Sequence, residues 1–96
     1  MSGLVTRQIR VSGLVQGVGF RAALREEARR RGVRGWVRNR SDGSVEALVH
    51  GSAHAVEEIV AWARRGPPGA RVTEVQTSEA AAPHESADRF ELRPTV

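Results

Sequence analysis

Hydrophobic and polar residues alternate in five short stretches of the chain, the pattern expected of strands that bury one face. The first spans Leu4–Ser12, where Ile9 and Val11 fall on the side predicted to be buried. The other predicted strands are Val33–Asn39, Ser44–His50, Arg71–Ser78 and Arg89–Arg93. A turn around Asp42 and Gly43 makes the second and third strands antiparallel neighbours. Glu79–Ala87 is rich in alanine but contains a proline, and we interpret it as a mobile loop.

Two further segments repeat hydrophobic residues at the helical period. The first helix is predicted to begin at about Arg21 and to end before Gly32, with three arginines in its last turn. The second is predicted from about His54 to Arg65, followed by a glycine and two prolines that end it. Its hydrophobic residues follow the i, i+3, i+4, i+7 spacing and are Val56, Ile59, Val60 and Ala63.

The order of elements is therefore β, α, β, β, α, β, with a final strand added. Two helices cannot bury their hydrophobic stripes on each other and also cover a sheet, so both should pack on one face of an antiparallel sheet. This is an α+β fold, a ferredoxin-like α/β sandwich. We expect a single domain over residues 1–96.

The length and composition of the sequence exclude several classes of protein. A chain of 96 residues and 10.4 kDa has room for one small core, which excludes a two-domain enzyme. The sequence has no cysteine, so disulfides, thiolate zinc sites and cysteine nucleophiles are excluded together. No hydrophobic run approaches the roughly 20 residues of a membrane span, and the first residues do not resemble a secretory signal. We expect a cytoplasmic protein that is a monomer.

The basic residues are all arginine. Fifteen of them against eleven acidic residues give a net charge of +4. The isoelectric point near 11.4 overstates this excess, because arginine titrates so high. Phosphate chemistry and a solvated surface both explain such a composition.

The densest cluster of glycines predicts a binding site. Gly13, Gly17 and Gly19 join the first strand to the first helix, and such a loop leaves several backbone N–H groups free to converge on an anion. A tight connection without a ligand explains the glycines equally well. Arg21 favours the anion, because the positive end of the helix dipole repels a cation there unless a bound dianion lies between them. The alternative is that Arg21 points into solvent.

Asn39 ends the second predicted strand, just before the turn. An amide at this position commonly stabilises the turn itself, and from the residue alone we favour that role. As a functional group, the amide offers both a donor and an acceptor. It can therefore hold a water molecule in a fixed direction without ionising.

These residues fall in two motifs that resemble the signatures of the acylphosphatase family. Gly13-Leu14-Val15-Gln16-Gly17-Val18-Gly19-Phe20-Arg21 is similar to the first signature, G-x-V-Q-G-V-x-F-R. Gly35-Trp36-Val37-Arg38-Asn39, followed by Gly43, Val45 and Gly51, is similar to the second without a gap or a mismatch. With the predicted order of elements, the resemblance covers essentially the whole chain.

The resemblance implies hydrolysis of the carboxyl-phosphate bond of acyl phosphates to a carboxylate and inorganic phosphate. It further implies that Asn39 orients the attacking water and that no metal or other cofactor is required. The phosphate would be bound by Arg21 and by the backbone amides of the loop, which are those of Val15, Gln16, Gly17, Val18, Gly19 and Phe20.

Other classes fit less well. RNA-recognition domains share the order of elements, but they present aromatic residues on their central strands, and neither Leu4–Ser12 nor Ser44–His50 contains one. An acylphosphatase-like domain also opens large carbamoyl-transfer maturation proteins, whose zinc-ligand cysteines are missing from this sequence. The three histidines, His50, His54 and His84, have no ligand spacing, so we predict no metal site.

Overall fold

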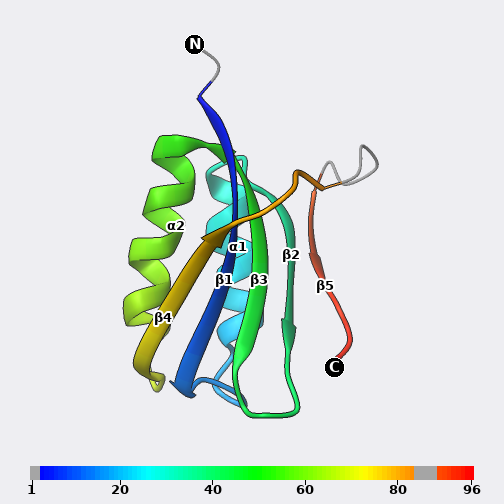
Figure 1. The fold of residues 1–96 in the computed structure, drawn as a ribbon. Helices are drawn as coiled ribbons and strands as arrows, with labels where there is room; N and C mark the ends of the chain where they lie inside the picture. Colours follow the sequence, from blue (N-terminus) through cyan, green and yellow to red (C-terminus); the bar gives the residue numbers. More distant parts are fainter. Residues whose placement is uncertain (1–2, 84–88) are drawn as a thin grey trace.

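The structure is a computed structural model that describes residues 3–83 and 89–96 (Figure 1). Each predicted strand and helix is present, with bounds that differ by a few residues. The elements in chain order are β1 (Leu4–Leu14), α1 (Phe20–Arg30), β2 (Arg34–Asn39), β3 (Val45–Ser52), α2 (Ala53–Arg65), β4 (Arg71–Glu79) and β5 (Phe90–Leu92). Of the mobile loop predicted over Glu79–Ala87, Glu79 belongs to β4 and residues 80–83 form neither helix nor strand, while positions 84–87 lie outside the described residues.

The strands form one sheet in the order β4-β1-β3-β2-β5. Three pairs, β1 with β3, β1 with β4, and β2 with β3, are antiparallel, as predicted. The fifth strand corrects the prediction of an antiparallel sheet, because β5 pairs parallel with β2, with Phe90 opposite Gly35. The chain leaves β4 at the end of the sheet where β2 begins, so β5 enters in the direction of β2 (Figure 1). The sheet is therefore mixed.

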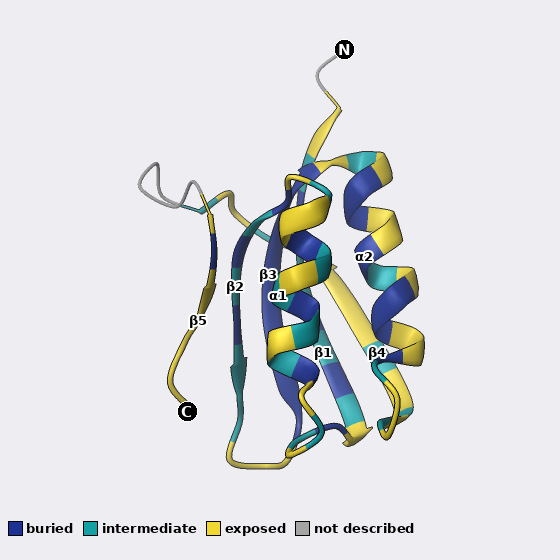
Figure 2. Ribbon diagram, turned by 180° about the vertical axis from the view of Figure 1, so that it is seen from behind, coloured by how far each residue is buried: buried dark blue, intermediate teal, exposed yellow. Residues whose placement is uncertain are grey.

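Both helices cover the same face of the sheet, and their inner sides are buried (Figure 2). The fold is the predicted ferredoxin-like sandwich. Phe20 at the start of α1 packs against Trp62 of α2, with ring centroids 5.3 Å apart, and so joins the two helices. The largest fully buried side chains are Phe20, Phe90, Ile9, Leu24, Ile59, Val11, Val15, Val37, Val45, Val49 and Val56.

The first strand is longer than its pattern predicted. Gly13 and Leu14, which we expected in the loop, continue the pairing with β4 after a β-bulge between Ser12 and Gly13. Gly13 has φ +123°, and a Cβ there would lie 2.1 Å from the carbonyl oxygen of Arg71. Glycine therefore allows the strand to pass through the bulge and deliver the chain to the loop that follows.

Candidate active site

A cavity of about 140 Å³ brings together the two predicted motifs. Most of its lining comes from the loop after β1 and the first turn of α1, and the rest from the ends of β2 and β5. The lining residues are Val15, Gly17, Gly19, Phe20, Arg21, Ala22, Asn39 and Leu92. Of the predicted site residues, Gln16 and Val18 are the two that do not line it.

The loop between β1 and α1 turns through two glycines. Gly17 has φ +77° and Gly19 has φ +80°, a region that residues with a Cβ adopt only with strain. Gly19 is the N-cap of α1 and has no side chain to accept a hydrogen bond from the first turn. No side chain of the described residues therefore accepts a hydrogen bond from the N–H groups of that turn, which carry the positive end of the helix dipole.

Arg21 lies in the first turn of α1 and lines the cavity. The first turn of α1 contains no acidic residue. Within residues 3–83 and 89–96, Arg21 forms no salt bridge or side-chain hydrogen bond. Its guanidinium group is thus an unneutralised cation beside free N–H groups, which is an arrangement suited to an anion with several oxygens.

Asn39 reaches the same cavity from the end of β2. It follows Val37 by two residues, so the two side chains lie on the same face of the sheet. Val37 is fully buried on the face that the helices cover. The oxygen Oδ1 of Asn39 is buried and accepts no hydrogen bond from any described residue. The turn role that we favoured for this amide is not seen, since the Asn39 side chain forms no hydrogen bond to any described residue.

Asp42 stabilises the turn instead. Its Oδ1 accepts hydrogen bonds from the backbone N–H of Ser44, at 2.9 Å, and from the Ser44 hydroxyl, at 2.6 Å. These two bonds, first that to the hydroxyl and then that to the backbone, lower the pKa of Asp42. Asp42 is thus ionised at neutral pH and shapes the hairpin that follows Asn39.

Gln16 connects the loop to this hairpin. Its Nε2 donates to the carbonyl oxygen of Arg40, at 2.8 Å, and to that of Ser44, at 2.9 Å. The same two residues are paired by a backbone bond from Arg40 N to Ser44 O. Gln16 therefore holds the loop at a fixed distance from the residue that follows Asn39, although its own side chain stays outside the cavity.

The other predicted loop residues contribute through their backbone. The side chains of Val15 and Phe20 are buried in the core, and that of Val18 packs partly against it. Their packing anchors both ends of the loop. Leu92 of β5, which the motifs did not indicate, adds a hydrophobic wall to the cavity.

A buried carboxylate supports the hairpin from the opposite face of the sheet. Glu46 is 3% exposed and binds Arg38 Nε at 2.9 Å and Arg40 Nη1 at 3.2 Å, and it also accepts a short hydrogen bond from Gln8. Burial raises the pKa of Glu46, but the bonds and charges of the two arginines outweigh it and lower that pKa below its ordinary value. The carboxylate therefore stays ionised and fixes the two arginines that flank Asn39.

Metal-ligating groups do not gather in the described part of the chain. No cluster of three or more histidine, aspartate or glutamate residues occurs there. Its helices are also too short or too polar to cross a membrane.

Comparison with known proteins gives one consistent answer. The family model for acylphosphatase matches residues 7–92. An acylphosphatase from Acidovorax sp. strain JS42 is 54% identical over 92 residues, which cover 96% of this chain and 93% of that protein. The structure of an acylphosphatase from Coxiella burnetii superposes with a TM-score of 0.88 at 34% identity, covering 95% of this chain and 94% of that one. Full-length HypF, whose structure was solved with phosphate and nucleotide, matches at 27% identity and a TM-score of 0.86, covering 99% of this chain but 12% of that one.

The fold and these comparisons thus define a small α+β hydrolase. The chain belongs to the acylphosphatase family, whose enzymes act on small acyl phosphates.

Proposed function

We propose that this chain hydrolyses acyl phosphates by direct attack of water on the phosphorus atom, at the cavity that Arg21 and Asn39 share. One observation carries the proposal. Among the described residues, an arginine without a salt bridge, a helix N-terminus without a side-chain cap and a buried amide oxygen without a donor all belong to a single cavity.

The phosphate group occupies the loop in this mechanism. The amides of residues 15–20 surround its oxygens, and the Arg21 guanidinium holds two of them with parallel N–H bonds. Phosphoryl transfer passes through a loose transition state whose negative charge is spread over the equatorial oxygens, so donors fixed around those oxygens lower the barrier. Their preorganisation follows from the anchoring of the loop by Val15, Gln16 and Phe20.

Asn39 orients the attacking water. Its Oδ1 accepts one hydrogen of the water, which turns a lone pair of the water oxygen towards the phosphorus. An amide cannot take the proton, so we assign the proton to a phosphate oxygen of the substrate. The bond from water oxygen to phosphorus forms while the bond from phosphorus to the carboxyl oxygen breaks, and the electron pair leaves with the carboxylate.

The leaving group explains why so few side chains suffice. A carboxylate is stable as an anion at neutral pH, so no general acid is needed to protonate it. We accordingly propose a reaction that requires no metal ion and no other cofactor. A cytoplasmic location, a monomeric state and one functional domain over residues 1–96 belong to the same proposal and stay predictions.

Release of phosphate from benzoyl phosphate in the presence of a chelator tests the site. Arg21→Ala and Asn39→Ala should each lower turnover by roughly two to three orders of magnitude at an unchanged fold, since removal of one preorganised hydrogen-bonding group costs ~3 to 4 kcal/mol. Arg25→Ala is the matched control, because Arg25 lies one turn further along α1 and does not line the cavity. Near-wild-type hydrolysis by either site variant, or loss of activity on chelation, contradicts the proposal.

A further inference from the structure

Glu46 of β3 is a buried carboxylate to which the proposed mechanism gives no part. It lies on the face of the sheet away from the helices, because its two neighbours in β3 belong to the hydrophobic core. Its Oε1 accepts hydrogen bonds from Arg38 Nε, at 2.9 Å, and from Arg40 Nη1, at 3.2 Å. Its Oε2 accepts a short one from Gln8. Both oxygens are therefore engaged, and the carboxylate is fixed in place.

The two arginines are the neighbours of Asn39 in the chain. Arg38 lies opposite Glu46 in the pairing of β2 with β3, whereas Arg40 follows the last residue of β2, which is Asn39 itself. One carboxylate thus holds the chain on both sides of Asn39. Through Arg40, it also holds the chain beyond the point where β2 ends.

Other contacts fix the same segment. The Arg38 guanidinium lies over the ring of Trp36, 4.6 Å from its centroid. The backbone N–H of Arg40 donates to the carbonyl oxygen of Ser44, at 2.9 Å. The Oδ1 atom of Asn39, by contrast, accepts no hydrogen bond from any described residue. Its position is therefore set by packing and by the backbone that carries it.

We propose that Glu46 is a positioning residue for the hydrolysis of acyl phosphates: through the two arginines, it holds the backbone of Asn39 where the amide oxygen reaches the attacking water. This role rests on the proposed function, because it requires Asn39 to orient that water. A displacement of about 1 Å at a reacting group costs up to roughly 10²-fold in rate. Binding of the phosphate by the loop and Arg21 does not depend on Glu46.

Glu46→Gln tests this role, because it keeps the size of the side chain and removes both salt bridges. We expect kcat for benzoyl phosphate to fall about ten-fold or more, since Asn39 loses its fixed position. The inhibition constant of inorganic phosphate should stay within about two-fold of the wild type, because phosphate in the loop needs no oriented water. A merely structural role would lower the melting temperature and leave kcat, measured well below that temperature, unchanged.

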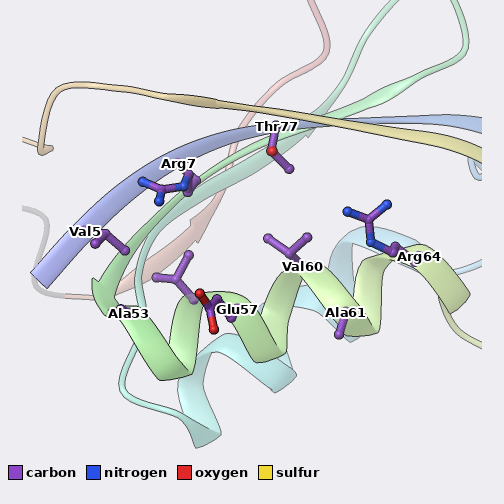
Figure 3. A pocket seen from close by; sticks show the side chains of 9 residues that line it. Val5, Arg7, Ala53, Glu57, Val60, Ala61, Arg64 and Thr77 are labelled. Atoms are coloured by element: carbon purple, nitrogen blue, oxygen red, sulfur yellow. The ribbon is translucent and has the colours of Figure 1, made fainter. Parts of the chain in front are cut away.

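Two glutamates outside this network supply matched controls. Glu27 of α1 forms salt bridges with Arg30 and Arg31, so Glu27→Gln also releases two arginines from one carboxylate, but away from the cavity. Glu57 of α2 is exposed and lines a separate cavity of about 290 Å³ between α2 and the strands β1 and β4 (Figure 3). Glu57→Gln makes the same change in net charge without breaking a salt bridge between described residues. Both controls should keep kcat and the inhibition constant within about two-fold of the wild type.

A double variant tests whether Glu46 acts through Asn39. Glu46→Gln should lower kcat by less than about two-fold in a protein that already carries Asn39→Ala, whereas independent effects would multiply. Two-dimensional NMR of the isotope-labelled chain gives a second measure. The side-chain amide signals of Asn39 should shift in Glu46→Gln and stay in place in both controls.

Arg38→Gln provides a milder variant should Glu46→Gln not fold, because Glu46 then keeps Arg40 and Gln8 as partners. It should lower kcat a few-fold and leave the inhibition constant of phosphate unchanged. An unchanged kcat in these variants, or losses that multiply in the double variant, overturns the role of Glu46 while the loss in Asn39→Ala leaves the proposed function standing. Near-wild-type hydrolysis by Asn39→Ala contradicts the proposed function first, and the role of Glu46 with it.

Discussion

At the scale of single residues, the candidate active site contains two groups that lack a partner within the described chain. Arg21 sits at the helix end that disfavours a cation, and Asn39 buries an oxygen without a donor. Both arrangements cost folding free energy. In the proposed mechanism a bound phosphate and an ordered water would remove both costs, so the site would be least favourable when empty and would gain most from its substrate.

Replacing Arg21 by lysine tests whether the planar guanidinium group matters or only its charge. We expect Arg21→Lys to recover little of the turnover lost in Arg21→Ala, because an ammonium is a point charge that cannot hold two oxygens in parallel. Steady-state kinetics with benzoyl phosphate compares the two variants. Recovery of the turnover of Arg21→Lys to within a few-fold of the wild type contradicts the bidentate role.

Gln16 should affect catalysis without touching the substrate through its side chain. Gln16→Ala removes both hydrogen bonds to the hairpin that carries Asn39, so the loop and the amide lose their fixed separation. We expect kcat to fall about ten-fold or more and the free energy of unfolding to fall by about 1 to 2 kcal/mol. Kinetics and urea denaturation measure the two effects, and an unchanged kcat would show that the bridge serves stability alone.

Sequence reasoning located some of these residues and missed others for a physical reason. Arg21 and Asn39 belong to contiguous motifs, so residue type and position were enough to predict a charged donor and a neutral amide at the site. The Gln16 side chain donates to backbone carbonyls 24 and 28 residues away. No local sequence pattern can predict such contacts. Leu92 reaches the cavity through the pairing of β5 with β2, which the alternation of residues does not specify.

At the scale of elements, close contact between strands depends on particular glycines. Gly35 of β2 has φ +140°, and a Cβ there would lie 1.8 Å from the carbonyl oxygen of Leu48 in β3. Gly43 in the hairpin also has a positive φ, +94°, but a Cβ there would meet nothing within 4 Å. A substitution at Gly35 would therefore cause steric overlap as well as backbone strain, whereas one at Gly43 would cause backbone strain alone.

This pair gives a direct prediction for stability. Gly43→Ala should cost about 1 to 2 kcal/mol, the cost of a left-handed backbone for a residue with a Cβ. Gly35→Ala should cost about 4 kcal/mol or more, because β2 and β3 must separate near the start of β2 to relieve the overlap. Urea denaturation of both variants checks the order, and equal losses would show that the sheet adjusts without cost.

The order and type of the elements were predictable because the periods of 2 and 3.6 residues are strong in this chain. The direction of β5 was not predictable, because the alternation of hydrophobic and polar residues indicates a strand but not the strand with which it pairs. The true end of β1 was also missed. We predicted a loop from the glycines that follow Ser12, but Gly13 belongs to a bulged part of β1 and continues its pairing with β4.

At the scale of the whole molecule, the face of the sheet away from the helices carries buried polar pairs. His50 of β3 lies opposite Thr6 of β1, and its Nδ1 lies 2.7 Å from the Thr6 hydroxyl oxygen. Burial, and then the positive charge of Arg34, lower the pKa of His50 below its ordinary value of 6.5. The folded protein therefore favours the neutral imidazole.

The lowered pKa of His50 makes the stability of the folded protein depend on pH. Because the unfolded chain binds a proton at His50 more readily, the contribution of His50 to stability is present above about pH 6.5 and is lost as the pH falls towards its folded pKa. The melting temperature should drop between pH 7.5 and pH 5.5, and less so in His50→Asn, which keeps a hydrogen-bonding group beside Thr6. His54 and His84 are common to both proteins, so the difference in slope isolates His50, and identical slopes contradict the assignment.

The parallel pairing of β5 has one more consequence, which concerns hydrogen exchange. Because β5 covers β2, the strand that ends in Asn39 lies inside the sheet, and the backbone continues this pairing where Val96 N–H donates to Asn39 O and Ser41 N–H to Val96 O. We expect the amides of β2 and of Ser41 to exchange slowly, whereas those of Gly17 and Gly19 exchange within the fastest group. The two halves of the candidate site would then differ in hydrogen exchange as well as in proposed role: the backbone around Asn39 is protected by pairing, whereas the amides of the loop proposed to bind phosphate are not.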